Sequence, residues 1–169
     1  KDGGAPTLFT QDGGDPLKGK NTLDIPAGTH TIAEPSTAGY SSSSSGQCSG
    51  TFAPGTDYTC TFTNNDIAPH LTLEKIVDVS ANGGIASPSA WTLTAACTSP
   101  ATCSGSGLDG AGSVAGDVKA GTYALSESVG PSGYTAQPWI CTGGGIQSGS
   151  NITLGLTENV TCRITNVSQ

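Results

Sequence analysis

The sequence predicts an all-β protein made of two tandem immunoglobulin-like β-sandwich domains. Composition is the first reason, because 169 residues include 25 glycines, 10 prolines and no methionine, a mixture that suits short strands joined by turns better than helices. The second reason is that no segment shows the apolar spacing of an amphipathic helix. The third is an internal repeat, which divides the chain into two similar copies.

The repeat is visible in two segments of the chain. GTHTIAEPSTAGYSSSSSGQC and then YTCTFTN lie within residues 28–64, and GTYALSESVGPSGYTAQPWIC and then VTCRITN lie within residues 121–166. Pro69 interrupts strand pairing between the copies. The aligned pairs are Gly28 and Gly121, Glu34 and Glu127, Tyr40 and Tyr134, Cys48 and Cys141, Cys60 and Cys162, and Asn64 and Asn166.

These boundaries predict the domain organisation. We expect a first β-sandwich over residues 1–67, a linker over 68–70 and a second β-sandwich over 71–169. Short strands separated by Gly, Pro and Ser are typical of sandwiches. The strands expected in the second copy are 71–79, 90–97, 112–118, 121–127, 133–141, 150–156 and 159–166.

Charge and motifs exclude several classes of function. A formal net charge of −7 argues against nucleic acid, because few basic residues are present to neutralise phosphates, and against an anionic membrane surface. No apolar run reaches the length of about 18 residues that a membrane span needs. We find no catalytic triad order, paired catalytic carboxylates or phosphate loop, and expect no enzyme with turnover and no cofactor. A chain that begins at Lys1 without methionine is expected to be a processed or partial product.

The chain has six cysteines and no C-x-x-C motif. Zinc would need closely spaced thiolates together with histidine, whereas His30 and His70 lie in unrelated contexts. We therefore expect no metal site and favour disulfides formed in an oxidising, extracytoplasmic compartment. The repeat pairs the two equivalent cysteines within each copy, and the remaining two close a short loop in the second copy. The expected disulfides are Cys48–Cys60, Cys97–Cys103 and Cys141–Cys162.

Three polar residues of the second copy, Lys75, Glu127 and Asn166, fall in phase with apolar neighbours. Side chains alternate between the two faces of a strand, so all three belong to faces that are otherwise apolar. Burying an unpaired ammonium costs roughly several kcal/mol. The shared faces are Leu71, Leu73, Lys75, Val77 and Val79; Tyr123, Leu125, Glu127 and Val129; and Val160, Cys162, Ile164 and Asn166.

Three interpretations of these residues are open. Each can lie at a strand end, where the pleat reaches water, or Lys75 and Glu127 can form a buried ion pair. Alternatively, the amine of Lys75 can attack the side-chain amide of Asn166, expel ammonia and leave an isopeptide bond. Burial favours the neutral amine that this attack needs by lowering the pKa of lysine. A protonated glutamic acid can donate to the amide oxygen and shuttle protons, while contact imposed by the fold supplies a high effective concentration.

The motifs LTLEKIV, GTYALSESVGPSGY and CRITN, in this order, resemble the CnaB-like or SpaA-like prealbumin-type β-sandwich repeats of bacterial surface adhesins and pilins. The resemblance covers nearly all of residues 71–169 and, without its first strand, residues 1–67. It implies an intramolecular isopeptide bond with Lys75 as nucleophile, Asn166 as acceptor and Glu127 as proton shuttle.

The same resemblance implies a structural protein, outside the cell on a bacterial surface or secreted, that serves as a stalk or filament segment. Its expected partners are neighbouring repeats or subunits of the same protein. The alternative is an adhesion module that binds a glycan or a host protein through its loops.

The first copy departs from this pattern. Lys75 precedes an NGG turn by seven residues, whereas Lys1 precedes the matching DGG by one, so the lysine strand is missing. Glu34 and Asn64 then have no visible partner, and we expect an open sheet edge. The missing strand lies upstream in a longer chain, which we favour, or is donated by a neighbouring molecule.

Overall fold

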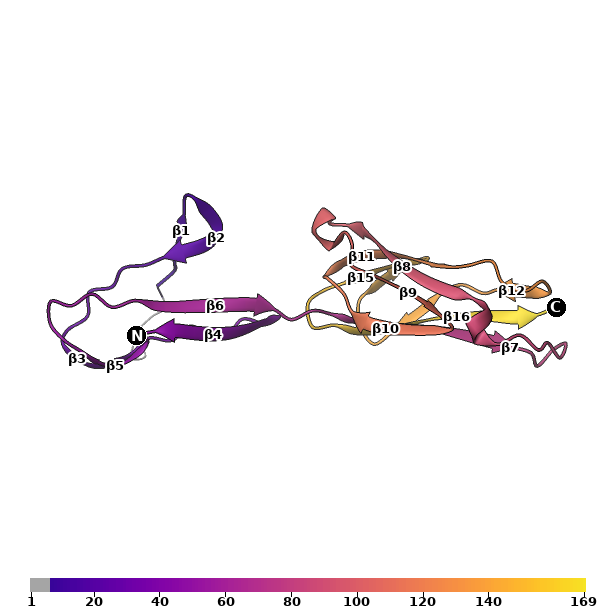
Figure 1. Ribbon diagram of the computed structural model, residues 1–169, viewed down its shortest axis with the longest axis horizontal. Coiled ribbons are helices and arrows are strands. Elements are labelled where there is room, and N and C mark those ends of the chain that lie inside the picture. The colour runs from indigo at the N-terminus through magenta and orange to yellow at the C-terminus, as the bar shows by residue number, and fades with distance from the viewer. Residues whose placement is uncertain (1–6) are drawn as a thin grey trace. The chain divides into compact units, whose positions relative to one another are not determined.

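The chain forms two compact units, residues 1–65 and 66–169 (Figure 1). The computed structural model describes residues 7–169, with the backbone alone at Asp12. Lys1, considered above as a substitute for the missing lysine, lies outside the described residues. Strands supply nearly all of the regular structure, so the all-β prediction is confirmed.

Helical structure is confined, in the described residues, to two 3₁₀ turns, η1 (Pro88–Ala90) and η2 (Ala101–Cys103). Neither turn has the length or the apolar character that a membrane-crossing helix requires.

One sheet of the second unit is built around the first and last strands of that unit. β7 and β16 run parallel and side by side, so that Lys75 lies opposite Ile164. β10 pairs with the other edge of β7, and two short strands pair with the other edge of β16. The strands are β7 (His70–Asp78), β10 (Ser113–Asp117), β12 (Tyr134–Ala136), β13 (Ile140–Thr142) and β16 (Asn159–Ser168).

The opposing sheet has the strand order β14-β15-β11-β8-β9, and its pairs are antiparallel. Its members are β8 (Thr92–Ser99), β9 (Gly107–Ala111), β11 (Gly121–Glu127), β14 (Ile146–Ser148) and β15 (Asn151–Leu154).

The core of the second unit lies between these two sheets. Each inner strand contributes alternate residues to it, as the period of two predicts. The packed cluster includes Leu71 and Leu73 of β7, Leu93 and Ala95 of β8, Tyr123 and Leu125 of β11, Ile152 and Leu154 of β15, and Val160 and Ile164 of β16. The predicted β-sandwich is therefore confirmed for this unit.

Several strand boundaries differ from the predictions. The segment 133–141 is broken into β12 and β13, because Pro138 between them has no N–H to donate to the sheet. β9 and β14 were not predicted, since neither carries a strong apolar alternation. Val79 and Val129 lie just beyond the ends of β7 and β11 and are 38% and 99% exposed, so their predicted inner positions are wrong.

The segment expected as a linker is hydrogen-bonded within the second unit. Pro69 is buried, and its carbonyl accepts from the N–H of Val118 at 2.9 Å. The N–H of His70 donates to the carbonyl of Glu158 at 2.8 Å. The second unit therefore begins a few residues before Leu71.

The described part of the first unit contains three two-stranded sheets, β1-β2, β3-β5 and β4-β6. The β3-β5 pair, in which Gly28 lies opposite Phe52, matches β11-β15, in which Gly121 lies opposite Leu154. The strands are β1 (Thr10–Asp12), β2 (Asp15–Lys20), β3 (Gly28–Thr31), β4 (Tyr40–Gly46), β5 (Ser49–Phe52) and β6 (Cys60–Asp66).

Little apolar surface is buried in the first unit. Among its described residues Phe52 is the only buried apolar side chain. The Tyr58 ring meets it edge-on, with 4.8 Å between ring centroids. Leu8 and Leu17 are 88% and 94% exposed. That residues 1–67 form an incomplete sandwich stays a prediction.

Candidate functional site

Lys75 is a lysine inside the core of the second unit. β10 and β16 hold both edges of β7, and the alternation that buries Leu71 and Leu73 turns Lys75 to the same inner face. Its side chain is 0% exposed. The amine therefore cannot reach bulk water and must find its partners inside the sandwich.

Glu127 meets this amine from the opposing sheet. It is the last residue of β11, and its carboxylate accepts a hydrogen bond from Nζ of Lys75. The Glu127 side chain is 13% exposed, so the charge pair is largely removed from solvent. The contact joins the two sheets near the end of the sandwich where β11 stops.

Aromatic rings close the site on another side. Nζ of Lys75 lies 4.7 Å from the centroid of the Trp91 ring, a distance at which a cation is attracted to the ring face. Tyr134 meets Trp91 edge-on, with 5.4 Å between centroids. Gly130 packs so closely on the Trp91 ring that a Cβ there would collide with Nε1 of Trp91. The ring is therefore held in place over the amine.

Asn166 lies on the strand beside Lys75. In the parallel register Ile164 is opposite Lys75 and Asn166 is opposite Val77, which puts Asn166 one pleat further along on the same inner face. The residue is 3% exposed. Among the described residues no donor bonds its buried Oδ1, and a buried polar atom without a partner costs about 1–3 kcal/mol.

Burial changes the proton affinity of the amine. Desolvation lowers the pKa of Lys75 below its usual 10.5, and the hydrogen bond and charge of Glu127 oppose this shift without cancelling it. The neutral amine is therefore more accessible than on an exposed lysine. A neutral amine beside a buried carboxamide and a carboxyl group is a set that can exchange an amide for ammonia.

For Lys75 and Asn166, these observations exclude one of the three interpretations given for the inward-facing polar residues, namely that they lie at strand ends open to water. Lys75 and Asn166 are buried, so they do not lie where the pleat reaches water. Lys75 and Glu127 form an ion pair, and Asn166 lies on the neighbouring strand. Trp91 was missed as a neighbour of the amine, because it lies just before β8 of the opposing sheet and no spacing in the sequence relates it to Lys75.

The six cysteines form three disulfides. Cys141–Cys162 joins β13 to β16 with 4.0 Å between Cα atoms, and Cys48–Cys60 has the equivalent place in the first unit with 4.8 Å. Cys97–Cys103 joins β8 to η2. All three are the pairs expected from the repeat.

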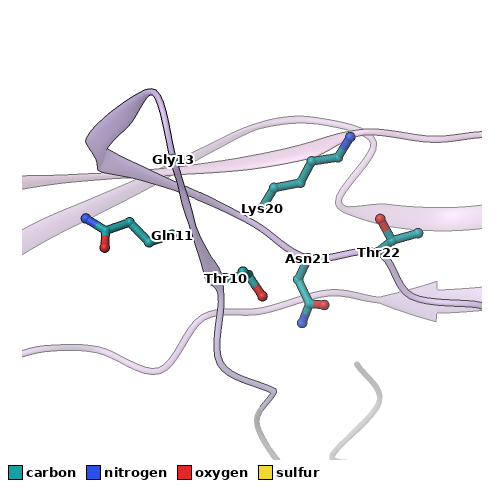
Figure 2. A pocket seen from close by; sticks show the side chains of 6 residues that line it. All are labelled: Thr10, Gln11, Gly13, Lys20, Asn21 and Thr22. Atoms are coloured by element: carbon teal, nitrogen blue, oxygen red, sulfur yellow. The ribbon is translucent and has the colours of Figure 1, made fainter.

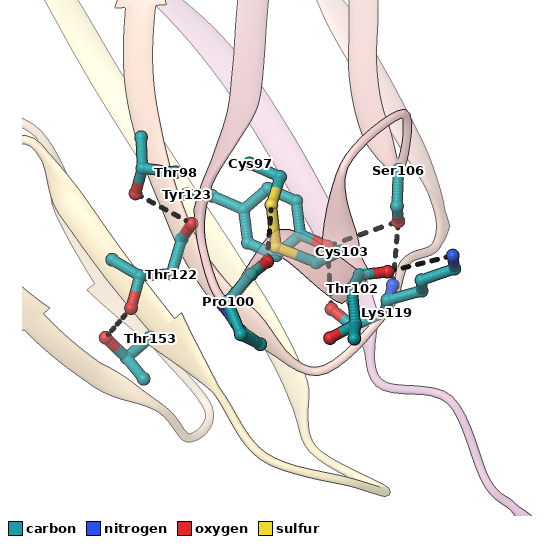
Figure 3. The surroundings of a disulfide bond; sticks show 10 residues. All are labelled: Cys97, Thr98, Pro100, Thr102, Cys103, Ser106, Lys119, Thr122, Tyr123 and Thr153. Atoms are coloured by element: carbon teal, nitrogen blue, oxygen red, sulfur yellow. Dashed lines mark hydrogen bonds between the residues drawn. A yellow bond between two sulfur atoms is a disulfide. The ribbon is translucent and has the colours of Figure 1, made fainter.

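The Cys97–Cys103 loop is anchored by a small polar network (Figure 3). The hydroxyl of Tyr123 donates to the carbonyl of Lys119 at 2.6 Å and lies 3.2 Å from the hydroxyl of Ser106. Nζ of Lys119 donates to the carbonyl of Thr102 at 2.9 Å. These bonds hold the loop against the sheet.

A surface hollow in the first unit carries no comparable cluster of chemical groups. It measures about 670 Å³ and lies beside the β1-β2 hairpin, where Figure 2 shows side chains that point in different directions. Its lining residues are Thr10, Gln11, Gly13, Lys20, Asn21 and Thr22. Within residues 7–169 no group of His, Cys, Asp and Glu is placed to hold a metal ion.

Comparison with known proteins identifies the family to which the chain belongs. The family described as "Prealbumin-like fold domain" matches residues 66–164. Among solved structures, the chain is similar to the major pilin protein (T-13) from Streptococcus pyogenes serotype GAS131465, with 15% identity and a TM-score of 0.43. That match covers 72% of this chain and 52% of the pilin chain, so this chain spans about half the pilin's length. No curated protein matches it. The chain belongs to the prealbumin-like fold domain family.

Proposed function

We propose that this protein is a structural component outside the cell, on a bacterial surface or secreted, and that it serves as a segment of a stalk or filament. Its second unit carries an isopeptide bond between Lys75 and Asn166, formed once with Glu127 as proton shuttle. The observation that supports this most is a fully buried amine paired with a carboxyl group, beside a buried amide whose oxygen lacks a donor.

The proposed reaction uses the three side chains as follows. Glu127 takes a proton from the ammonium of Lys75, and the neutral amine attacks Cγ of Asn166. The protonated carboxyl group stabilises the developing negative charge on Oδ1 and then gives a proton to the leaving nitrogen. One C–N bond forms, one breaks, and ammonia departs. The product removes a buried charge, which explains how the sandwich tolerates a lysine in its core.

The strand arrangement gives this bond a mechanical role. The chain enters the unit through β7 and leaves through β16, and because these strands are parallel their outer ends lie at opposite ends of the sheet. Tension on the chain therefore shears β7 along β16. A covalent link between residues 75 and 166 joins the two loaded strands and keeps the rest of the unit out of the line of force.

A protease digest tests the proposed bond directly. We expect tandem mass spectrometry to find the segment around Lys75 joined to the segment around Asn166, with one ammonia lost. Lys75→Arg keeps a cation in the core and should abolish the product. Glu74→Gln, on the outer face of β7, is the matched control for Glu127→Gln, and only the latter should slow the reaction, by about 10²-fold or more. Unlinked segments in the unaltered protein would refute the proposal.

Exposed apolar loops support a second candidate, adhesion to a glycan or a host protein. Ile85 and Val129 are 100% and 99% exposed. Their loops meet at the pair of rings described above, where the N–H of Ala86 donates to the Tyr134 hydroxyl at 3.0 Å and Gly130 packs on Trp91. Immobilised glycans and matrix proteins test this: binding should be lost in Ile85→Ser with Val129→Ser, and binding that survives both changes would exclude these loops.

A further inference from the structure

The first unit contains a sheet edge whose counterpart in the second unit is occupied. β4 pairs with one edge of β6, as β12 and β13 pair with one edge of β16. The other edge of β16 holds β7. Along residues 7–169 no strand pairs with the corresponding edge of β6.

Two side chains beside this edge repeat the chemistry of the second unit. Nδ2 of Asn64 donates to Oε2 of Glu34 at 2.9 Å, and the hydroxyl of Ser42 donates to the same oxygen at 3.3 Å. These are the repeat equivalents of Asn166 and Glu127. The ion pairs found among the described residues include none to Glu34. The acceptor amide and the carboxylate are in contact, and no described ammonium accompanies them.

Burial along β6 and just before it shows what the empty edge lacks. Val160, at 0% exposed, corresponds to Tyr58, at 37%. Asn166 is buried, whereas Asn64 is exposed. An alternating apolar strand laid along β6 would remove this surface from water, as β7 does for β16.

We propose that this edge of β6 accepts, in the parallel direction, an extended strand of the pattern apolar-x-apolar-x-Lys from another repeat of the same kind. In the register of β7 on β16, the incoming lysine lies opposite Phe62 and the two apolar residues before it lie opposite Cys60 and Tyr58. Its amine then reaches Glu34 and Asn64. The inference rests on the function proposed above and extends its chemistry to a junction between repeats.

The occupant is not the β7 strand of this chain or of a second folded copy, because β10 and β16 already occupy both edges of that strand. The occupant is instead the lysine-bearing strand of another repeat, unpaired at the edge that meets β6. The amine attacks Cγ of Asn64, a C–N bond forms, the bond to the amide nitrogen breaks, and ammonia leaves with the protons passing through Glu34. No oxidant, reductant or further reactant is needed.

The experiment adds an acetylated peptide of residues 70–78, HLTLEKIVD, to the full chain and follows the product by mass spectrometry after denaturation and digestion. We expect an adduct equal to chain plus peptide less one ammonia, with the new bond at Asn64. Asn64→Ala should abolish the adduct, and Glu34→Gln should slow it by about 10²-fold or more. The Lys75→Arg form of the peptide should give none.

Three results would overturn this inference: no adduct, an adduct away from Asn64, or a chain in which one of its own amines is already joined to Asn64. The same digest reports the link between Lys75 and Asn166 independently. Failure of the first-unit site and failure of the proposed function are therefore seen separately.

Discussion

The two units contain the same repeat but differ in how much of it is assembled. In the second unit, β7 completes a five-stranded sheet and a continuous apolar core lies beneath it. In the first unit, the described strands form three separate pairs, and the ring of Phe52 is the one buried apolar side chain among the described residues. The glutamate and asparagine are present in both units. In the second unit the lysine strand contributes buried apolar side chains as well as an amine.

The largest expected effect is on mechanical unfolding of the second unit. With the disulfides reduced, the second unit should resist stretching, because the link between Lys75 and Asn166 removes the intervening chain from the extension. Asn166→Ala should release about 300 Å more, the length of that chain at about 3.3 Å per residue. Single-molecule pulling measures the difference. Arg163→Gln, which removes only the exposed partner of Glu74, is the control, and equal extensions for the unaltered and Asn166→Ala proteins would contradict the account.

The next largest expected difference is in how much a Leu→Ala substitution destabilises each unit. Leu93, which is 0% exposed, lies in the core of the second unit, and Leu93→Ala should lower its free energy of unfolding by about 2–5 kcal/mol. Leu17, at 94% exposed, is the same residue type in the first unit, and Leu17→Ala should cost at most about 0.5 kcal/mol. Amide hydrogen exchange measures the loss of stability in both units in one experiment. Similar losses in the two variants would mean that the first unit has a core of comparable strength.

The equivalent disulfides provide a smaller contrast. Cys141–Cys162 closes 21 residues and Cys48–Cys60 closes 12, so removal of the first should destabilise its unit more, within a range of about 2–4 kcal/mol. Paired Cys→Ser variants with the other bridges intact, followed by hydrogen exchange in urea, measure both losses. A larger loss at Cys48–Cys60 would reverse the expected order.

Proton linkage gives the smallest effect. Asn166→Ala leaves Lys75 with a titratable amine whose pKa in the folded state is lowered from 10.5 by burial. Between that lowered pKa and about 10.5 the unfolded chain binds more protons, so stability should rise with pH across this interval. Urea unfolding followed by tryptophan fluorescence measures it. Adding Lys75→Met should remove the rise, and stability that falls over the interval would show that the buried amine prefers its charge.

Much of the second unit could be predicted from its sequence, because alternation directly reports which side chains face a core. The strand 121–127 was predicted with its observed bounds, and the inner positions of Lys75 and Asn166 followed from phase alone. Strands lacking apolar alternation, such as β9, gave no such signal. Phase also cannot show where a strand stops, which is why Val129 was misplaced.

Only part of the site could be predicted from the repeat and from the alternation of apolar residues along each strand. They indicated which residues face inward, but partners on opposite sheets are brought together by the packing of the two layers. The Trp91 ring beside the amine is of this kind, since Trp91 lies just before β8 of the opposing sheet. It depends on a tertiary contact that no spacing along the chain encodes.

The number of ammonia molecules lost by the intact, reduced and denatured chain tests the central claim most directly. If the bond forms in the second unit and not in the first, the measured mass should be lower than the mass calculated from the sequence by one ammonia. Lys75→Arg should abolish this loss, and Asn64→Ala should leave it at one ammonia. A mass that equals the sequence would contradict the proposed bond. A loss of two would show that the first unit closes with an amine of its own chain.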